Sequence, residues 1–240
     1  LNLIQKSYEL NPANKDAILG LGIYNYAVDY VVDRYPFLKA VLFFFPKGNK
    51  ELGLTQLRDC ADNGKYSRTE ATVTLAYIHL SYEKNYLEAL KYAQKLTAIY
   101  PGNPVFERFL GKCYVGLNNY NAGITLYGGM QAKADSNKPG YNNNYIRREV
   151  NYYLGVCYSR TGNLDEALKK YETAIEICKI TDKPGEESPY YVFSILGTGV
   201  IYEQKGNKPE AIKYYDMVLG MRDVENSKET AQKFKDNALK

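Results

Sequence analysis

The sequence predicts an all-α fold in which antiparallel helix pairs stack into a solenoid, and three observations lead to this class. First, Tyr114, Tyr158 and Tyr202 follow one another at a spacing of 44 residues, each at the end of a similar phrase (LGKCY, LGVCY and GTGVIY). Second, apolar residues downstream recur at helical spacing, as at Tyr171 and Ala174. Third, each phrase carries a Gly, which allows two helices to approach to about 8–10 Å. One such pair cannot bury its apolar face, so stacked neighbours must supply the core.

The composition excludes several classes of protein. The chain has 240 residues, of which 45% are hydrophobic and 24% are charged, as in an ordinary globular protein. The net charge of +4 is small and no long block of one sign occurs, so we expect no nucleic-acid partner. No stretch is long and apolar enough for a transmembrane helix. The chain has one His and no hydrolase elbow, P-loop or GxGxxG motif, so we expect no enzyme, no cofactor and no small-molecule substrate.

The repeated phrases resemble the tetratricopeptide repeat (TPR), a helix–turn–helix unit of about 34 residues. The clearest copy runs from Arg148 to about Lys179. It matches the family pattern at Leu154, Gly155, Tyr158, Gly162, Ala167, Tyr171 and Ala174. The resemblance covers nearly the whole chain. It implies a right-handed superhelical solenoid that binds other proteins without catalysis.

The elements follow in order from this frame. We expect residues 1–14 to be the second helix of a truncated repeat, 15–69 a repeat with an apolar insert at 31–47, 70–103, 104–147, 148–191 and 192–226 four further repeats, and 227–240 a capping helix. Gly162 and Gly206 lie where a left-handed residue would end the first helix of a pair. Two Lys-Pro-Gly phrases, at 138–140 and 183–185, predict longer second helices followed by turns. These spacers are either tolerated surface insertions or an edge that binds a partner.

The insert at 31–47 is the largest departure from the repeat. Its apolar side chains are Phe37, Leu38, Val41, Leu42, Phe43, Phe44 and Phe45. Pro36 suits the first turn of a short helix, which is far too short to span a bilayer. The segment can pack on the solenoid, contact a partner or a second copy, or lie on a membrane surface. Of these alternatives we favour packing on the solenoid.

A second resemblance involves the insert and the phrase GNKELGLTQLRDCADNGKYSRTEA that follows it. Together they are similar to bacterial relatives of the eukaryotic TPR proteins implicated in clearing inclusion bodies from lipid-linked sites. This likeness covers about residues 15–107. It slightly favours the alternative in which the insert lies on a membrane surface.

The TPR resemblance also implies a binding groove, lined by set positions of each first helix. Carried onto this chain, those positions are Leu19, Ile23, Tyr26, Thr74, Ile78, Ser81, Arg108, Lys112, Val115, Tyr152, Val156, Ser159, Leu196, Val200 and Glu203. The groove is expected to be apolar and aromatic with a basic patch at Arg108 and Lys112, which Arg147, Arg148 and Arg160 extend. We expect the double reversal Arg108→Glu with Lys112→Glu to abolish capture of an acidic partner while leaving helicity intact.

The cysteines and the single His show no metal-binding pattern. Cys60, Cys113, Cys157 and Cys178 form no CxxC, and we expect buried, reduced thiols. His79 shares a repeat position with Cys113 and Cys157, but equivalent positions of stacked helices lie about 10 Å apart. Zinc ligands must lie about 2.0–2.3 Å from the metal, so we interpret this column as core packing.

The sequence therefore favours a non-enzymatic scaffold for protein–protein interaction that binds a peptide or a helix in the groove. The alternative is a membrane-peripheral or self-associating structural protein that docks through Tyr35–Phe45. The chain begins at Leu1 without Met, which indicates a fragment or a processed form. Its compartment stays open: the cytoplasm is favoured, and an exported or lipid-anchored form is the alternative.

Overall fold

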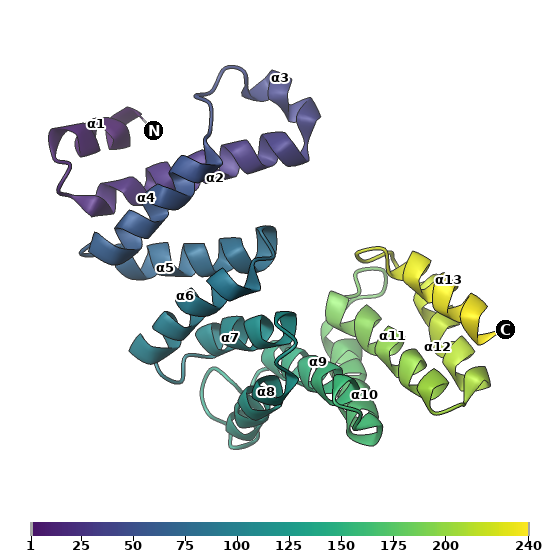
Figure 1. Cartoon of the computed structure of the whole chain (residues 1–240). Coiled ribbons are helices and arrows are strands. Elements are labelled where there is room, and N and C mark those ends of the chain that lie inside the picture. The colour runs from purple at the N-terminus through teal and green to yellow at the C-terminus, as the bar shows by residue number, and fades with distance from the viewer. Residues whose placement is uncertain (1, 240) are drawn as a thin grey trace. The chain divides into compact units, whose positions relative to one another are not determined.

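The computed structural model describes residues 2–239, and every regular element in that range is a helix (Figure 1). The chain divides into two compact units, which meet between Gly102 and Asn103. This boundary lies one residue before the expected junction between the segments 70–103 and 104–147. Among the described residues, no helix combines the length and the apolar character needed to cross a membrane.

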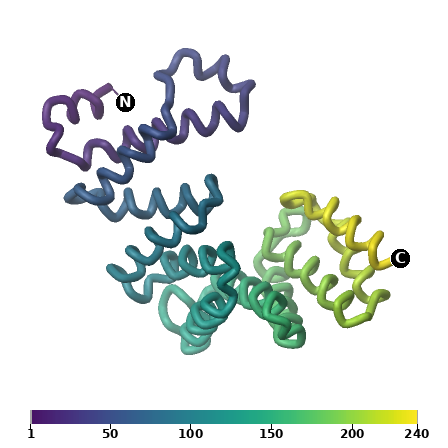
Figure 2. Tube along the Cα trace, viewed as in Figure 1, coloured from purple at the N-terminus to yellow at the C-terminus, as the bar shows by residue number. Residues whose placement is uncertain are grey.

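Unit 1 contains one N-terminal helix followed by two helix pairs. Its helices are α1 (Asn2–Leu10), α2 (Ile18–Arg34), α4 (Lys50–Asn63), α5 (Arg68–Tyr77) and α6 (Tyr86–Ile99), and α5 continues into a π-helical turn, η3 (Ile78–Tyr82). A short 3-10 turn, η1 (Lys15–Ala17), precedes α2. Each main helix packs against the next along the chain, as the trace in Figure 2 shows.

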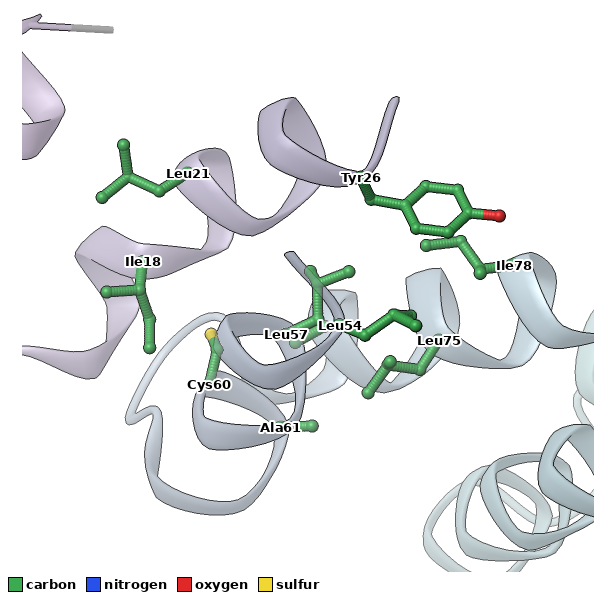
Figure 3. Packing of buried hydrophobic residues seen from close by; sticks show 10 residues of the cluster. Ile18, Leu21, Tyr26, Leu54, Leu57, Cys60, Ala61, Leu75 and Ile78 are labelled. Carbon is green, nitrogen blue, oxygen red and sulfur yellow. The ribbon is translucent and has the colours of Figure 1, made fainter. Parts of the chain in front are cut away.

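The core of unit 1 forms where α2, α4 and α5 meet. Ile18, Leu57, Cys60 and Leu75 are almost fully buried in one cluster (Figure 3). The α2–α4 crossing is close because Gly53 presses against the backbone of α2: a Cβ at this position would lie 2.5 Å from the Tyr26 amide nitrogen. A side chain at residue 53 would therefore push the two helices apart.

Unit 2 contains three helix pairs and a final helix. Its elements are α7 (Pro104–Gly116), α8 (Tyr120–Asp135), α9 (Asn144–Arg160), α10 (Leu164–Thr181), α11 (Pro189–Gln204), α12 (Lys208–Gly220) and α13 (Ser227–Ala238). Each helix packs against its successor, and α11 also contacts both α9 and α13. First helices of successive pairs therefore lie side by side, which is the arrangement that a solenoid of stacked pairs requires.

The helix ends follow from local sequence. Seven helices begin after an Asn whose side-chain oxygen accepts a hydrogen bond from a backbone N–H of the first turn: Asn49, Asn85, Asn103, Asn119, Asn143, Asn163 and Asn207. Gly162 and Gly206 follow α9 and α11 with φ of +82° and +78°. Their predicted role as left-handed helix stops is confirmed.

The two Lys-Pro-Gly spacers fold back onto unit 2. In the first, Tyr141 is fully buried and its hydroxyl donates to Glu107 Oε2 at 2.9 Å. In the second, Asp182 pairs with Arg148 and accepts a hydrogen bond from the Ser188 amide at 2.8 Å. The longer second helices α8 and α10 precede these turns, as the sequence predicts. These contacts give both spacers a structural role.

The insert differs from its prediction in two ways. Helix α2 continues through Arg34, and only a 3-10 turn, η2 (Pro36–Leu38), and one α-helical turn, α3 (Lys39–Leu42), follow it. Leu38 and Leu42 are half-buried, but Phe37, Phe43 and Phe44 are 74%, 81% and 86% exposed. The favoured expectation that the insert packs on the solenoid is therefore wrong for its aromatic residues. The segment turns back at Pro36, before its rings can reach a neighbouring helix.

Candidate functional site

Unit 2 carries an open pocket of about 560 Å³ between its first helices, which we call the α9–α11 pocket. It is lined by Tyr152, Val156, Ser159 and Arg160 of α9, Tyr171 of α10, Phe193, Leu196, Gly197, Val200 and Gln204 of α11, and Phe234 of α13. On α9 and α11 the lining residues recur every three or four positions, so each helix contributes one face. The wall mixes aromatic and aliphatic side chains with the polar groups of Ser159, Arg160 and Gln204, and polar atoms make up more than half of its exposed lining. A concave site that combines apolar contact with polar groups can bind a ligand in a defined orientation.

Tyr171 forms the floor of the α9–α11 pocket because two glycines make room for its ring. A Cβ at Gly155 of α9 would lie 2.6 Å from the ring, and one at Gly197 of α11 would lie 2.7 Å from it. Both distances are well below van der Waals contact. The ring therefore lies between two helix backbones, and it is only 5% exposed.

Tyr152 joins the pocket to a cluster of tyrosines. Its ring centroid lies 4.9 Å from that of Tyr153, 5.5 Å from that of Tyr190 and 6.2 Å from that of Tyr171. Burial raises the pKa of Tyr152 to about 12, so its hydroxyl is neutral and can donate or accept a hydrogen bond at any physiological pH. Mutual ring packing also holds these side chains in place before a ligand arrives.

The structure brings the C-terminal part of the predicted groove together. Tyr152, Val156 and Arg160 line one pocket, as do Ser159, Leu196 and Val200 from the same set of positions. The sequence analysis missed Tyr171, Phe193 and Phe234. Phe234 had a detectable signal, because Ala231, Phe234 and Ala238 form an apolar stripe on the capping helix.

Arg108 and Lys112 do not form a free basic patch. Both contact Glu149 of α9, which is fully buried: Arg108 Nε donates to Oε2 at 2.9 Å, and Lys112 Nζ lies 3.1 Å from Oε1. Burial alone would raise the pKa of the Glu149 carboxyl, but the Arg108 hydrogen bond and the Lys112 charge outweigh it and hold that pKa below its usual range. The two cations therefore hold α7 to α9.

This ion cluster argues against the expectation that both cations can be reversed without loss of helicity. Arg108→Glu with Lys112→Glu would gather three carboxylates, one of which is the Glu149 side chain with no exposed surface. An unpaired buried charge is strongly destabilising. We expect the double reversal to unfold part of unit 2, and it cannot serve as a clean test of binding.

In unit 1 the predicted groove residues are mostly structural. Tyr26 and Ile78 lie side by side in the core (Figure 3), and the Tyr26 hydroxyl donates to Glu83 Oε1 at 2.6 Å. Leu19 packs against the same cluster, and the Thr74 hydroxyl donates to the Glu70 carbonyl of its own helix at 2.8 Å. Ile23 is 42% exposed. The described pocket of unit 1 is lined by other residues, among them Tyr24 and Asn25.

His79 and the cysteines are core residues. His79 is 4% exposed and its ring stacks on Tyr92, with centroids 5.9 Å apart. Cys60, Cys113, Cys157 and Cys178 are buried free thiols, as expected. Among the described residues, no group of His, Cys, Asp and Glu side chains is placed to hold a metal ion.

Comparison with known proteins identifies the class of this fold. YrrB, described as a TPR protein with an unusual peptide-binding site, superposes with a TM-score of 0.55 at 17% identity over 96% of this chain and 97% of its own. A thermophilic TPR protein of Thermus thermophilus gives 0.53 at 17% identity over 94% and 98%. MamA of Desulfovibrio magneticus gives 0.55 at 15% identity over 79% and 94%. The chain has the fold of a TPR solenoid.

The sequence match is more local than the structural one. Residues 147–223 match the tetratricopeptide repeat family, and this range holds α10, α11, α12 and nearly all of α9. No curated protein matches the chain. The predicted TPR resemblance is confirmed by sequence for residues 147–223, and the described chain has the fold of TPR solenoids.

Proposed function

We propose that this protein is a non-enzymatic scaffold that holds an extended peptide or a helix of a partner protein in the α9–α11 pocket. The observation that carries the proposal is the pocket itself, about 560 Å³ of open volume whose wall combines aromatic and aliphatic side chains with polar groups. Its position between successive first helices agrees with the groove that the TPR resemblance implies. The peptide-binding site attributed to YrrB, which shares the fold, adds support.

The lining residues indicate the chemistry of the ligand. Val156, Phe193 and Val200 are half-buried and offer apolar contact without closing the pocket. Arg160 is exposed at the end of α9 and can form an ion pair with a carboxylate of the ligand. Gln204 and the Tyr152 hydroxyl, which also line the pocket, offer hydrogen bonds. We expect the preferred peptide to present a large apolar side chain with an acidic residue near it.

Selection from a displayed peptide library tests this proposal. The wild-type chain should enrich peptides with an apolar anchor and a neighbouring Asp or Glu. Val156→Glu puts a charge on the pocket wall. It should lower the affinity for the selected peptides by at least tenfold, as expected for a central contact.

Ile180→Glu is the matched control, because Ile180 is 76% exposed on α10 and does not line the pocket. This variant should bind like the wild type. Both variants should keep the wild-type circular dichroism spectrum. Enrichment of no peptide, or equal affinity of Val156→Glu and the wild type, would refute the proposal.

A further inference from the structure

The insert in unit 1 presents an aromatic surface to solvent. We call residues 35–45 the insert tip. Phe43 and Phe44 are 81% and 86% exposed, Phe37 is 74% exposed and Val41 is 62% exposed. The described ring contacts of these residues stay within the tip: Phe43 contacts Phe44, and Tyr35 contacts Phe37. A group of large, exposed apolar side chains within one short segment indicates an interaction site.

The base of the insert is firmly fixed to α2. The Tyr24 hydroxyl donates to the Pro46 carbonyl at 2.7 Å, and the Asn49 amide donates to the Asn25 carbonyl at 3.0 Å. Gly48 lies so close to α2 that a Cβ there would be 2.6 Å from the Asp29 amide nitrogen. The tip is therefore a projection on a fixed base, and its ordering on binding costs less than that of a free loop.

Every charged side chain from residue 34 to residue 50 is a cation, and the acidic residue at the base of the insert, Asp29 of α2, accepts a hydrogen bond from the Lys50 amide. Arg34, Lys39 and Lys47 are exposed, and none of them forms an ion pair with another described residue. The sequence has no acidic residue from 34 to 50; the nearest ones are Asp33 and Glu51. The aromatic rings are thus accompanied by three cations that the fold itself does not neutralise.

Exposed aromatic rings together with unpaired cations favour one kind of binding partner. Phenylalanine rings bury favourably at the boundary of headgroups and acyl chains, and each Lys or Arg near an anionic bilayer strengthens attachment by about fivefold. In a symmetric contact between two copies, the same patch on each copy would bring like cations together. We propose that the insert tip docks this protein on an anionic lipid surface.

Vesicle flotation of the full chain tests the proposal. The wild type should float with vesicles of phosphatidylcholine mixed with phosphatidylglycerol, and should not float with phosphatidylcholine alone. Phe43→Ser with Phe44→Ser should abolish flotation. Lys39→Gln with Lys47→Gln should weaken binding on the order of 25-fold, since two cations are removed.

Matched controls separate the tip from general surface effects. Leu87→Ser with Ile180→Ser removes two apolar side chains that are 60% and 76% exposed elsewhere. Lys183→Gln with Lys208→Gln removes two exposed cations far from the insert in sequence. Both control pairs should float like the wild type. Circular dichroism should show the same helicity for all variants.

A fluorescent probe gives an independent readout. The chain contains no Trp, so Phe44→Trp introduces a single tryptophan at the tip. Its emission should shift to the blue on addition of the anionic vesicles and should be quenched by brominated lipids. Leu87→Trp on α6 should show neither effect.

Three results would overturn the proposal. The first is failure of the wild type to float with anionic vesicles, and the second is equal binding to neutral and anionic vesicles. The third is a wild-type dimer in sedimentation that Phe43→Ser with Phe44→Ser dissolves while no vesicle is bound. In that case a second copy would be the occupant. None of these outcomes bears on the α9–α11 pocket, so the two proposals fail independently.

Discussion

The buried carboxylate of Glu149 determines the role of two cations, Arg108 and Lys112. Its carboxylate is fully buried, and it engages Arg108 and Lys112 from α7. Both cations belong to the positions that the resemblance assigns to the groove. Arg108 and Lys112 hold α7 to α9, whereas Arg160, which lines the pocket, has no ion pair with another described residue.

The Glu149 cluster makes the stability of unit 2 dependent on pH. Glu149→Gln should lower the free energy of unfolding at neutral pH by about 3 kcal/mol, because two cations lose a buried partner. The folded-state pKa of Glu149 is below the usual value of a Glu, so its contribution is present above about pH 4.3 and is lost as pH falls through the folded value. The difference between wild type and variant should therefore narrow in acid.

Denaturant titrations at pH 7 and near pH 3 measure this effect. Glu176→Gln is the control, because Glu176 pairs with Lys179 on the surface of the same unit and its side chain is 68% exposed. That change should cost at most about 0.5 kcal/mol. Identical unfolding midpoints for Glu149→Gln and wild type at pH 7 would show that the cluster does not stabilise unit 2.

The residue-level part of the site was only partly predictable. Periodicity places Tyr152 and Val156 on one face of α9, and the structure puts both in the pocket. Glu149, the partner of Arg108, lies 41 residues away in sequence. The two side chains meet only because α7 packs against α9. Charge is visible in a sequence, whereas the identity of a long-range partner depends on tertiary packing.

At the scale of elements, the regular helices were the most predictable part of the molecule. Asn caps and left-handed Gly stops are local signals, and residues such as Asn163 and Gly162 act within one turn of the chain. The insert is different, because its conformation depends on where Pro36 redirects the chain. The apolar composition of the insert predicts that its side chains become buried. It does not specify whether the solenoid, a partner or a membrane covers them.

The insert tip should be dispensable for folding. Replacement of residues 36–45 by a Gly/Ser linker of equal length keeps Pro46, Gly48 and their contacts with α2. We expect the thermal midpoint to change by no more than a few degrees, because exposed side chains contribute little to stability. A fall of more than about 10 °C, or lost helicity, would show that the tip belongs to the core.

At the scale of the whole molecule, the division into two units is the main feature. The cluster around Leu57 draws its members from unit 1, and those around Leu154, Tyr171 and Tyr215 draw theirs from unit 2. In repeat proteins stability is approximately the sum of local terms. Each unit therefore has the means to fold by itself.

A fragment spanning residues 103–240 should fold when produced alone. It should show a helical circular dichroism spectrum and one cooperative thermal transition, and it should bind the peptides selected by the full chain. An unfolded or aggregated fragment would contradict this prediction. A folded fragment that binds no selected peptide would place the binding site elsewhere.

Chemical labelling of the four buried cysteines can report local unfolding of the structure. Burial raises the pKa of Cys113 and Cys157 to about 12, and that of Cys60 and Cys178 to about 11, so almost no thiolate exists at neutral pH. Alkylating reagents need the thiolate, and so they modify each site only after its surroundings open. Cys60 is in unit 1 and the other three are in unit 2. The order in which these thiols become labelled therefore reveals which unit opens first.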